Sequence, residues 1–279
     1  MPRTPQFSVS HETAAVWRVT FLNPPMNLLD SDTIDELLQL SAAMLADKQL
    51  KIVVFQSADP DYFIAHYDMS RASEAAGKGG TPPWIEFTTR LAHMPVISLA
   101  SIRGRARGVG NEFALACDLR FASLEKAIFC QPEVAVGVVP GGGAVERLPL
   151  LLGRARALEV LLGCEDIDAA TAEHYGMVNR AIPDAELDGF VNRFVRRIAS
   201  FDRQALGTVK QLVNRKTLPS PDALGESLDT FRQSVAWEGR KRRAAPLAQR
   251  GISKRGDFEL RLGSCLGDLM PPGPDVDAH

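Results

Sequence analysis

Two glutamates in apolar surroundings are the residues of this sequence best suited to chemistry. Glu112 lies in GVGNEFALACD, which predicts a helix that is apolar on nearly every side, and Glu133 follows the apolar run AIFC. Two carboxylates in one apolar pocket acquire different pKa values, so one acts as a base and the other as an acid at neutral pH. In the alternative interpretation, Glu112 only complements the helix dipole and Glu133 lies on an exposed turn.

Two glycine clusters, Gly108/Gly110 and Gly141-Gly142-Gly143, each follow an apolar run and precede a predicted helix. The amides at a helix N-terminus can hold a phosphate or an oxyanion, so both kinds of site are considered. The segment GVGNEF lacks the third glycine of a dinucleotide fingerprint. The sequence contains no P-loop lysine and no G-x-S-x-G motif. The remaining alternative is that these glycines only make tight turns.

The elements that must position these residues alternate between strands and helices. Apolar runs predict strands at 15–23, 50–58 and 95–103, and helical periodicity predicts helices at 31–46 and 108–118. This alternation is typical of an α/β fold with a largely parallel sheet. Loop-like composition marks residues 72–83.

The C-terminal third is predicted to be helical, with segments at 185–200, 203–215 and 221–243. The composition predicts a core over residues 1–192, a helical region over 193–267 and a disordered tail over 268–279.

Composition restricts the possible partners and compartments. The 279-residue chain has a net charge of −2, so no nucleic-acid or membrane partner is expected from its overall charge. The four cysteines and five histidines show no metal-binding spacing, and no metal is expected. With neither a signal-peptide pattern nor a long apolar run, the expected location is the cytoplasm.

Several motifs in order resemble those of the crotonase superfamily, the enoyl-CoA hydratases and isomerases. They are NPPMNLL, YFIAHYDM, PVISLASIRGRARGVGNEFALACDLRFAS, FCQPEVAVGVVPGGGAVERLPLLLG and TAEHYGMVNRAIP. The third is similar to P-V-I-A-A-V-x-G-x-A-x-G-G-G-x-E-L-A-L-x-C-D-x-R-x-A, and the fourth to F-x-x-P-E-x-x-x-G-x-x-P-G-x-G-G. The resemblance extends from about residue 16 to residue 183.

This resemblance implies a crotonase-like spiral of ββα units with a helical C-terminal region that mediates trimerisation, assembled as homotrimers or dimers of trimers. It implies an enzyme of fatty acid metabolism, most simply a lyase that hydrates a 2-enoyl-CoA, with CoA thioester as substrate and no cofactor. The backbone amides of Tyr67 and Val109 would form the oxyanion hole. Glu112 would be the base toward water and Glu133 the acid and base at the α-carbon, with the Gly141 amide near the water or the second glutamate. The positions implied to contact substrate or CoA are Ala65, His66, Asp68, Gly108, Gly110, Gly141, Asn27, Arg71 and Lys210.

Departures from the family pattern leave alternatives open. His66, Tyr67 and Val109 replace small residues of the motifs, so the backbone at Val109 must be extended or helical for the hole to form. Isomerisation, decarboxylation and C–C cleavage are alternatives to hydration, and an isomerase or decarboxylase would use only one carboxylate. A catalytically weak protein that binds RNA or a partner through the basic run 240–243 is a further alternative. For His66, Asp68 and Lys210 the alternatives are a surface histidine, a structural aspartate and a solvated lysine.

Overall fold

The computed structural model describes residues 5–71 and 81–269. The loop predicted around 72–83 and the tail predicted from 268 therefore lie largely outside the described residues. Among the residues that are described, no helix is long and apolar enough to span a membrane.

Two sheets organise the core. The larger has the order β1-β2-β3-β5-β7-β10 and is parallel except for the β1–β2 pair. Its strands are β1 (Phe7–Thr13), β2 (Val16–Phe21), β3 (Ile52–Ser57), β5 (Ile97–Ile102), β7 (Leu119–Ser123) and β10 (Arg180–Ile182). The smaller has the order β4-β6-β8-β9 and consists of β4 (Tyr62–Ile64), β6 (Arg105–Arg107), β8 (Ile128–Cys130) and β9 (Ile167–Asp168).

The strands form a repeating ββα pattern. β3 and β4 precede α2 (Pro83–His93), β5 and β6 precede α3 (Val109–Ala116), and β7 and β8 precede α4 (Ala144–Leu152). In each repeat the first strand joins the larger sheet and the second joins the smaller, so the chain advances as a spiral. This confirms the predicted α/β class and the spiral of ββα units.

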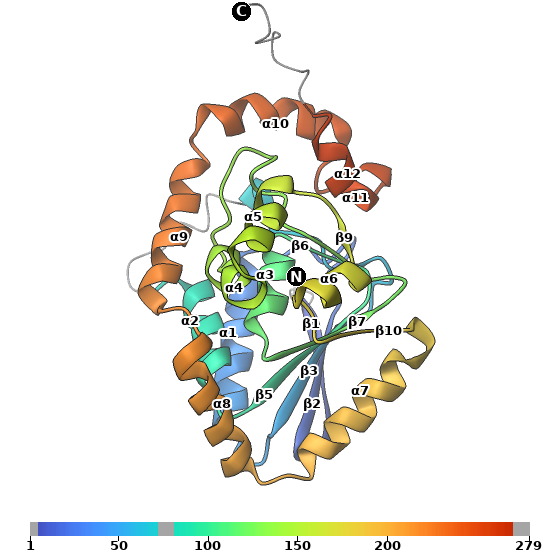
Figure 1. Cartoon of the computed structure of the whole chain (residues 1–279), viewed down its shortest axis with the longest axis vertical. Coiled ribbons are helices and arrows are strands. Elements are labelled where there is room, and N and C mark those ends of the chain that lie inside the picture. The colour runs from blue at the N-terminus through green and yellow to red at the C-terminus, as the bar shows by residue number, and fades with distance from the viewer. Residues whose placement is uncertain (1–4, 72–80, 270–279) are drawn as a thin grey trace, which may run out of the picture.

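The remaining helices cover the sheets and form the C-terminal region. They are α1 (Ser31–Ala46), α5 (Arg154–Gly163), α6 (Ala169–Tyr175), α7 (Asp184–Ala199), α8 (Arg203–Thr217), α9 (Pro221–Ser234), α10 (Glu238–Arg250), α11 (Asp257–Leu260) and α12 (Leu262–Leu266). Figure 1 shows α8, α9 and α10 as an arc around the core that ends at α11 and α12.

Local sequence signals explain why several predicted elements form. Asp30 accepts a hydrogen bond from the Thr33 amide at 2.8 Å and so caps α1. Strand β1 and the short strands β9 and β10 were not predicted. Six of the seven residues of β1 are exposed, so it lacks the apolar alternation from which a strand is recognised.

Helix α3 lies at the centre of the core, because all eight of its residues are buried. The Phe113 ring packs against the rings of Phe21, Phe55 and Phe87 at centroid distances of 5.3, 5.0 and 5.9 Å. These contacts fix the helix that carries Glu112.

The C-terminal region differs from its predicted boundaries in three places. Residue 192 falls inside α7, whose buried residues pack on the larger sheet, so a domain boundary there is wrong. The helix predicted over 221–243 ends at Ser234, where the buried Ser234 hydroxyl accepts from the Val139 amide, and resumes at Glu238. Leu269, assigned to the disordered tail, is buried beside Leu266.

Replacing Gly110 by alanine should destabilise the fold, because the added Cβ would lie 2.2 Å from the Ile64 carbonyl oxygen. We expect a loss of about 1–3 kcal/mol in the free energy of unfolding, measured by urea titration. Gly225, within α9, is the control because an added Cβ there meets no atom within 4 Å. Gly225→Ala should stabilise by about 0.5–1 kcal/mol, and equal effects of the two substitutions would contradict this packing argument.

Candidate active site

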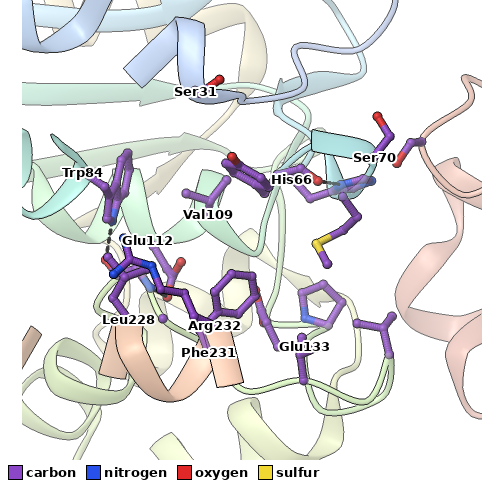
Figure 2. Close-up of a pocket in the computed structure, with 18 of the residues that line it drawn as sticks. Ser31, His66, Ser70, Trp84, Val109, Glu112, Glu133, Leu228, Phe231 and Arg232 are labelled. Carbon is purple, nitrogen blue, oxygen red and sulfur yellow. Dashed lines mark hydrogen bonds between the residues drawn. The ribbon is translucent and has the colours of Figure 1, made fainter. Parts of the chain in front are cut away.

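One cavity of about 640 Å³ contains both predicted carboxylates. Its wall is formed by the N-terminus of α3, the turn after β8, the glycine segment before α4, and the inner faces of α9 and α10. Figure 2 shows Glu112, Glu133, Val109 and His66 around this space, with Phe231 contributed by α9. The chain between the glutamates forms β7 and β8 and returns beside α3.

Glu112 is held in the first turn of α3 with 3% of its surface exposed. Its Oε1 accepts hydrogen bonds from the Gly142 amide at 2.8 Å and the Ala144 amide at 3.1 Å. Burial raises its pKa to about 7, although these amides and the Arg147 guanidinium favour the ionised form. Glu112 therefore titrates near neutral pH, as a general base requires.

Glu133 lies in the cavity wall and is half-buried, so the exposed-turn interpretation is wrong. Burial and the charge of Glu112 raise its pKa well above the ordinary value. Its Oε2 accepts from Gln131 Nε2 at 3.2 Å, and Gln131 Oε1 in turn accepts from Asn111 Nδ2 at 2.8 Å. This chain of contacts connects Glu133 to α3. The Gln131 hydrogen bond favours the ionised carboxylate, but burial and the charge of Glu112 outweigh it and favour the protonated state of Glu133.

The peptide that carries the Val109 amide is oriented by α3. The Gly108 carbonyl accepts from the Glu112 amide at 3.0 Å, so it points along the helix. Because C=O and N–H point in opposite directions across a trans peptide, the Val109 N–H points out of the helix N-terminus. Gly108 adopts the positive φ of 49°, and Val109 is helical, which meets the backbone condition set by the sequence.

The peptide that carries the Tyr67 amide is oriented by a parallel bridge. The Leu29 amide donates to the His66 carbonyl at 2.9 Å, and the Asp68 amide donates to the Leu29 carbonyl at 2.9 Å. The Tyr67 N–H is consequently directed away from Leu29. Tyr67 and Val109 both line the cavity, so the two amides belong to the same site.

His66 is not a surface histidine. Its side chain is buried, with Nε2 at 3.0 Å from Glu259 Oε1 and Nδ1 at 2.8 Å from the Tyr67 carbonyl oxygen. Burial lowers the pKa of the imidazole, but the charge and hydrogen bond of Glu259 outweigh it and raise the pKa above the ordinary value. Glu259 is separated from His66 by 193 residues, and no local sequence pattern indicates this pairing.

Two residues implied to bind CoA have structural partners. Lys210 is buried, and its Nζ donates to the Leu91 and Val96 carbonyls and to Asp118 at 2.7–2.9 Å, so the solvated alternative is wrong. Arg71 forms ion pairs with Asp30 and Asp32.

Four further predicted contacts hold the backbone and do not line the cavity. Asn27, at a positive φ of 52°, donates to the Tyr62 and Phe63 carbonyls and fixes the end of β4. Ala65 and Gly110 are packed in the interior, and Asp68 caps the turn that follows it through Ser70. Gly108 is also outside the lining but adjoins it, since a Cβ there would lie 2.7 Å from Glu133 Oε1.

The glycine segment also binds Glu112, a contact that the sequence did not predict. Gly141 lines the cavity, but the amides that bind Glu112 are those of Gly142 and Ala144. Trp84 Nε1 donates to the Gly142 carbonyl at 3.0 Å and fixes the same peptide. A repeated glycine gives no sequence signal for which of its amides points inward, so this assignment required the tertiary structure.

The basic run 240–243 does not form one charged patch. Consecutive helical residues are separated by about 100° around the axis, which spreads the four side chains around α10. Arg240 lines the cavity, Lys241 pairs with Glu238 at 2.7 Å, and Arg243 donates to the Gly239 carbonyl. The described residues contain no cluster of three or more histidine, cysteine or acidic side chains that could hold a metal.

Comparison with known proteins agrees with this geometry. The model of the enoyl-CoA hydratase/isomerase family matches residues 11–239. A short-chain-enoyl-CoA hydratase of Clostridium acetobutylicum is 30% identical over 229 residues, which cover 80% of this chain and 87% of that protein. A crotonyl-CoA hydratase of Syntrophomonas wolfei is 30% identical over 231 residues, covering 80% and 88%.

Solved structures show the same similarity in three dimensions. The crystal structure of a candidate enoyl-CoA hydratase from Streptomyces avermitilis is 42% identical, covers 95% of this chain and 98% of its own, and superposes with a TM-score of 0.90. The chain is an enzyme of the crotonase superfamily and belongs to its enoyl-CoA hydratase/isomerase family.

Replacing Lys210 by methionine should reduce stability without weakening substrate binding. The substitution leaves the Asp118 carboxylate without its buried partner, which we expect to destabilise the fold by about 3 kcal/mol in urea unfolding. The KM for a CoA thioester should remain within about twofold, because three protein acceptors already engage the three N–H donors of Nζ. Lys216→Met, on the exposed side of the same helix, is the matched control. A large rise in KM with unchanged stability would restore Lys210 as a CoA contact.

Proposed function

We propose that this enzyme adds water across the double bond of a 2-enoyl-CoA and forms a 3-hydroxyacyl-CoA. The observation that carries the proposal is the placement of two carboxylates, the buried Glu112 and the half-buried Glu133, in one cavity with raised pKa values. The names of the similar hydratases support the same reaction class. The CoA thioester is the substrate, and the reaction requires no further cofactor.

The protonation states assign the two carboxylates different roles. Ionised Glu112 accepts a proton from water while the water oxygen forms a bond to the β-carbon. The π electrons move toward the thioester carbonyl, and protonated Glu133 then donates its proton to the α-carbon as the carbonyl re-forms. Glu112 ends protonated and Glu133 ionised, so proton exchange with solvent restores the starting state.

The amides of Tyr67 and Val109 would stabilise the enolate oxygen formed in this sequence. Both peptides are fixed by hydrogen bonds of their own carbonyls, at Leu29 and Glu112, so the donors need no reorganisation during the reaction. The cavity walls include apolar side chains such as Leu228 and Phe231, which exclude water and strengthen the interaction.

We also propose assembly through the outer helices, as homotrimers or dimers of trimers. On α8, Val209, Leu212 and Val213 are 51–61% exposed, and an apolar surface of this kind favours contact between subunits. Cytoplasmic location is part of the proposal. It is supported by the four cysteines, all of which are free thiols.

Replacing each glutamate by glutamine tests the two-carboxylate mechanism. Glu112→Gln and Glu133→Gln should each lower kcat about 100-fold or more, because each removes one proton transfer. Turnover is followed as loss of the conjugated thioester absorbance with short, medium and aromatic enoyl-CoAs. Glu173→Gln, at an exposed position of α6, is the control and should leave kcat unchanged. A one-base isomerase or decarboxylase would instead retain activity in one of the two variants.

The pH dependence of kcat/KM should be bell-shaped with its acidic limb at about pH 7. Activity rises with pH as Glu112, whose pKa is about 7, becomes ionised. It falls only at a pH above the raised pKa of Glu133, because that residue must be protonated to donate. Rates measured from about pH 5 to about pH 9 give two apparent pKa values, which belong to the coupled pair of glutamates and not to either residue alone. An acidic limb near the ordinary glutamate pKa of about 4.3 would contradict the buried pair.

A further inference from the structure

Glu259, in the C-terminal helix α11, is fully buried beside the cavity. Its Oε1 lies 3.0 Å from His66 Nε2 and accepts from the Ser253 amide at 2.6 Å. Its backbone carbonyl accepts a hydrogen bond from Arg107 Nη1. A short helix near the end of the chain is thereby attached to two segments of the core.

These two core segments are the ones that carry the proposed oxyanion donors. His66 contributes the carbonyl half of the peptide whose N–H belongs to Tyr67. Arg107 immediately precedes Gly108, which contributes the carbonyl half of the peptide whose N–H belongs to Val109. Glu259 therefore contacts the chain one residue before the first donor and two residues before the second.

Beside an ionised Glu259 carboxylate, the ring of His66 carries a proton on both nitrogens. Nε2 faces the Glu259 carboxylate and Nδ1 faces the Tyr67 carbonyl oxygen, and neither of these oxygens can donate a hydrogen bond. An imidazolium satisfies both contacts, whereas a neutral ring satisfies only one. A buried imidazolium requires a nearby negative charge, which Glu259 provides.

The surrounding charges keep this pair ionised. Burial raises the pKa of Glu259, but His66, Ser253 and Arg107 outweigh it and lower the pKa below the ordinary value. Arg107 is itself paired with Asp166 at 2.6 Å. Glu259 Oε2 has no hydrogen-bond partner among the residues the structure describes, which is unfavourable for stability.

We propose that Glu259 is a positioning residue: through His66 its carboxylate fixes the peptide whose Tyr67 amide polarises the thioester carbonyl, while its backbone carbonyl holds Arg107 next to the segment of the second donor. This inference rests on the proposed oxyanion hole. It also gives His66, which departs from the family motif, an indirect role: His66 positions the peptide of Tyr67.

The test compares Glu259→Gln and Glu259→Ala with the unaltered enzyme in two measurements. The first is kcat and KM with a short enoyl-CoA. The second is the absorbance maximum of bound 4-(dimethylamino)cinnamoyl-CoA, which shifts to longer wavelength when its carbonyl is more strongly polarised. We expect Glu259→Ala to lower kcat about tenfold, with KM changed less than about threefold, and to reduce the red shift.

Glu259→Gln keeps the shape of the side chain but not its charge, so it remains informative if the alanine variant does not fold. It should also reduce the red shift, because the imidazolium loses its counter-ion. Asp257→Asn, which removes an exposed pair with Arg261 in the same helix, is the control and should change neither measurement.

A double-mutant cycle separates positioning from a general loss of structure. If Glu259 acts mainly through His66, the double variant of Glu259→Ala and His66→Ala should have nearly the red shift of His66→Ala alone. An unaltered red shift in both Glu259 variants, or additive effects in the cycle, would overturn the inference. Absence of turnover by the unaltered enzyme, with its red shift intact, would refute the proposed hydration and still leave the role of Glu259 measurable.

Discussion

The site depends on one constraint: the carboxylate of Glu112 is buried and must still be able to carry a charge. An ionised group in the interior is strongly unfavourable unless hydrogen bonds satisfy it, and the amides of Gly142 and Ala144 do so. A Cβ at Gly142 would lie 2.1 Å from Glu112 Oε2. The buried Glu112 therefore requires glycine at position 142, within the cluster Gly141-Gly142-Gly143. The turn after β8 brings Glu133 into the same space, where the two carboxylates raise one another's proton affinity.

The proposed oxyanion hole tolerates Tyr67 and Val109 because neighbouring residues determine how their peptides are oriented. Gly108 takes the left-handed conformation, so Val109 needs only an ordinary helical backbone. Tyr67 follows a peptide that is fixed by the Leu29 amide. An amide donor depends on the orientation of its peptide and not on its own side chain. The departures from the family motif thus alter the cavity wall while leaving the donors in place.

The C-terminal helices complete the site. Phe231 from α9 and Leu247 from α10 close the cavity, and Glu259 from α11 reaches the segment before Tyr67. The bend between α9 and α10 follows the glycine segment closely: Gly137 lies against the backbone of Arg240, and Gly141 against Phe231. The C-terminal region, which the sequence predicts as a separate helical segment, is therefore part of the cavity wall.

The sequence alone determined the α/β class, the buried helix, the two glutamates and the family, because these depend on local periodicity and on short motifs. The tertiary structure alone decided which amide binds Glu112, and that Lys210, Asn27 and Arg71 hold protein groups. It also paired His66 with Glu259 across 193 residues. A motif is recognised from residue types that lie close together in the sequence. The partner of a buried charge lies instead on a distant segment, and only the fold brings that segment within hydrogen-bond distance.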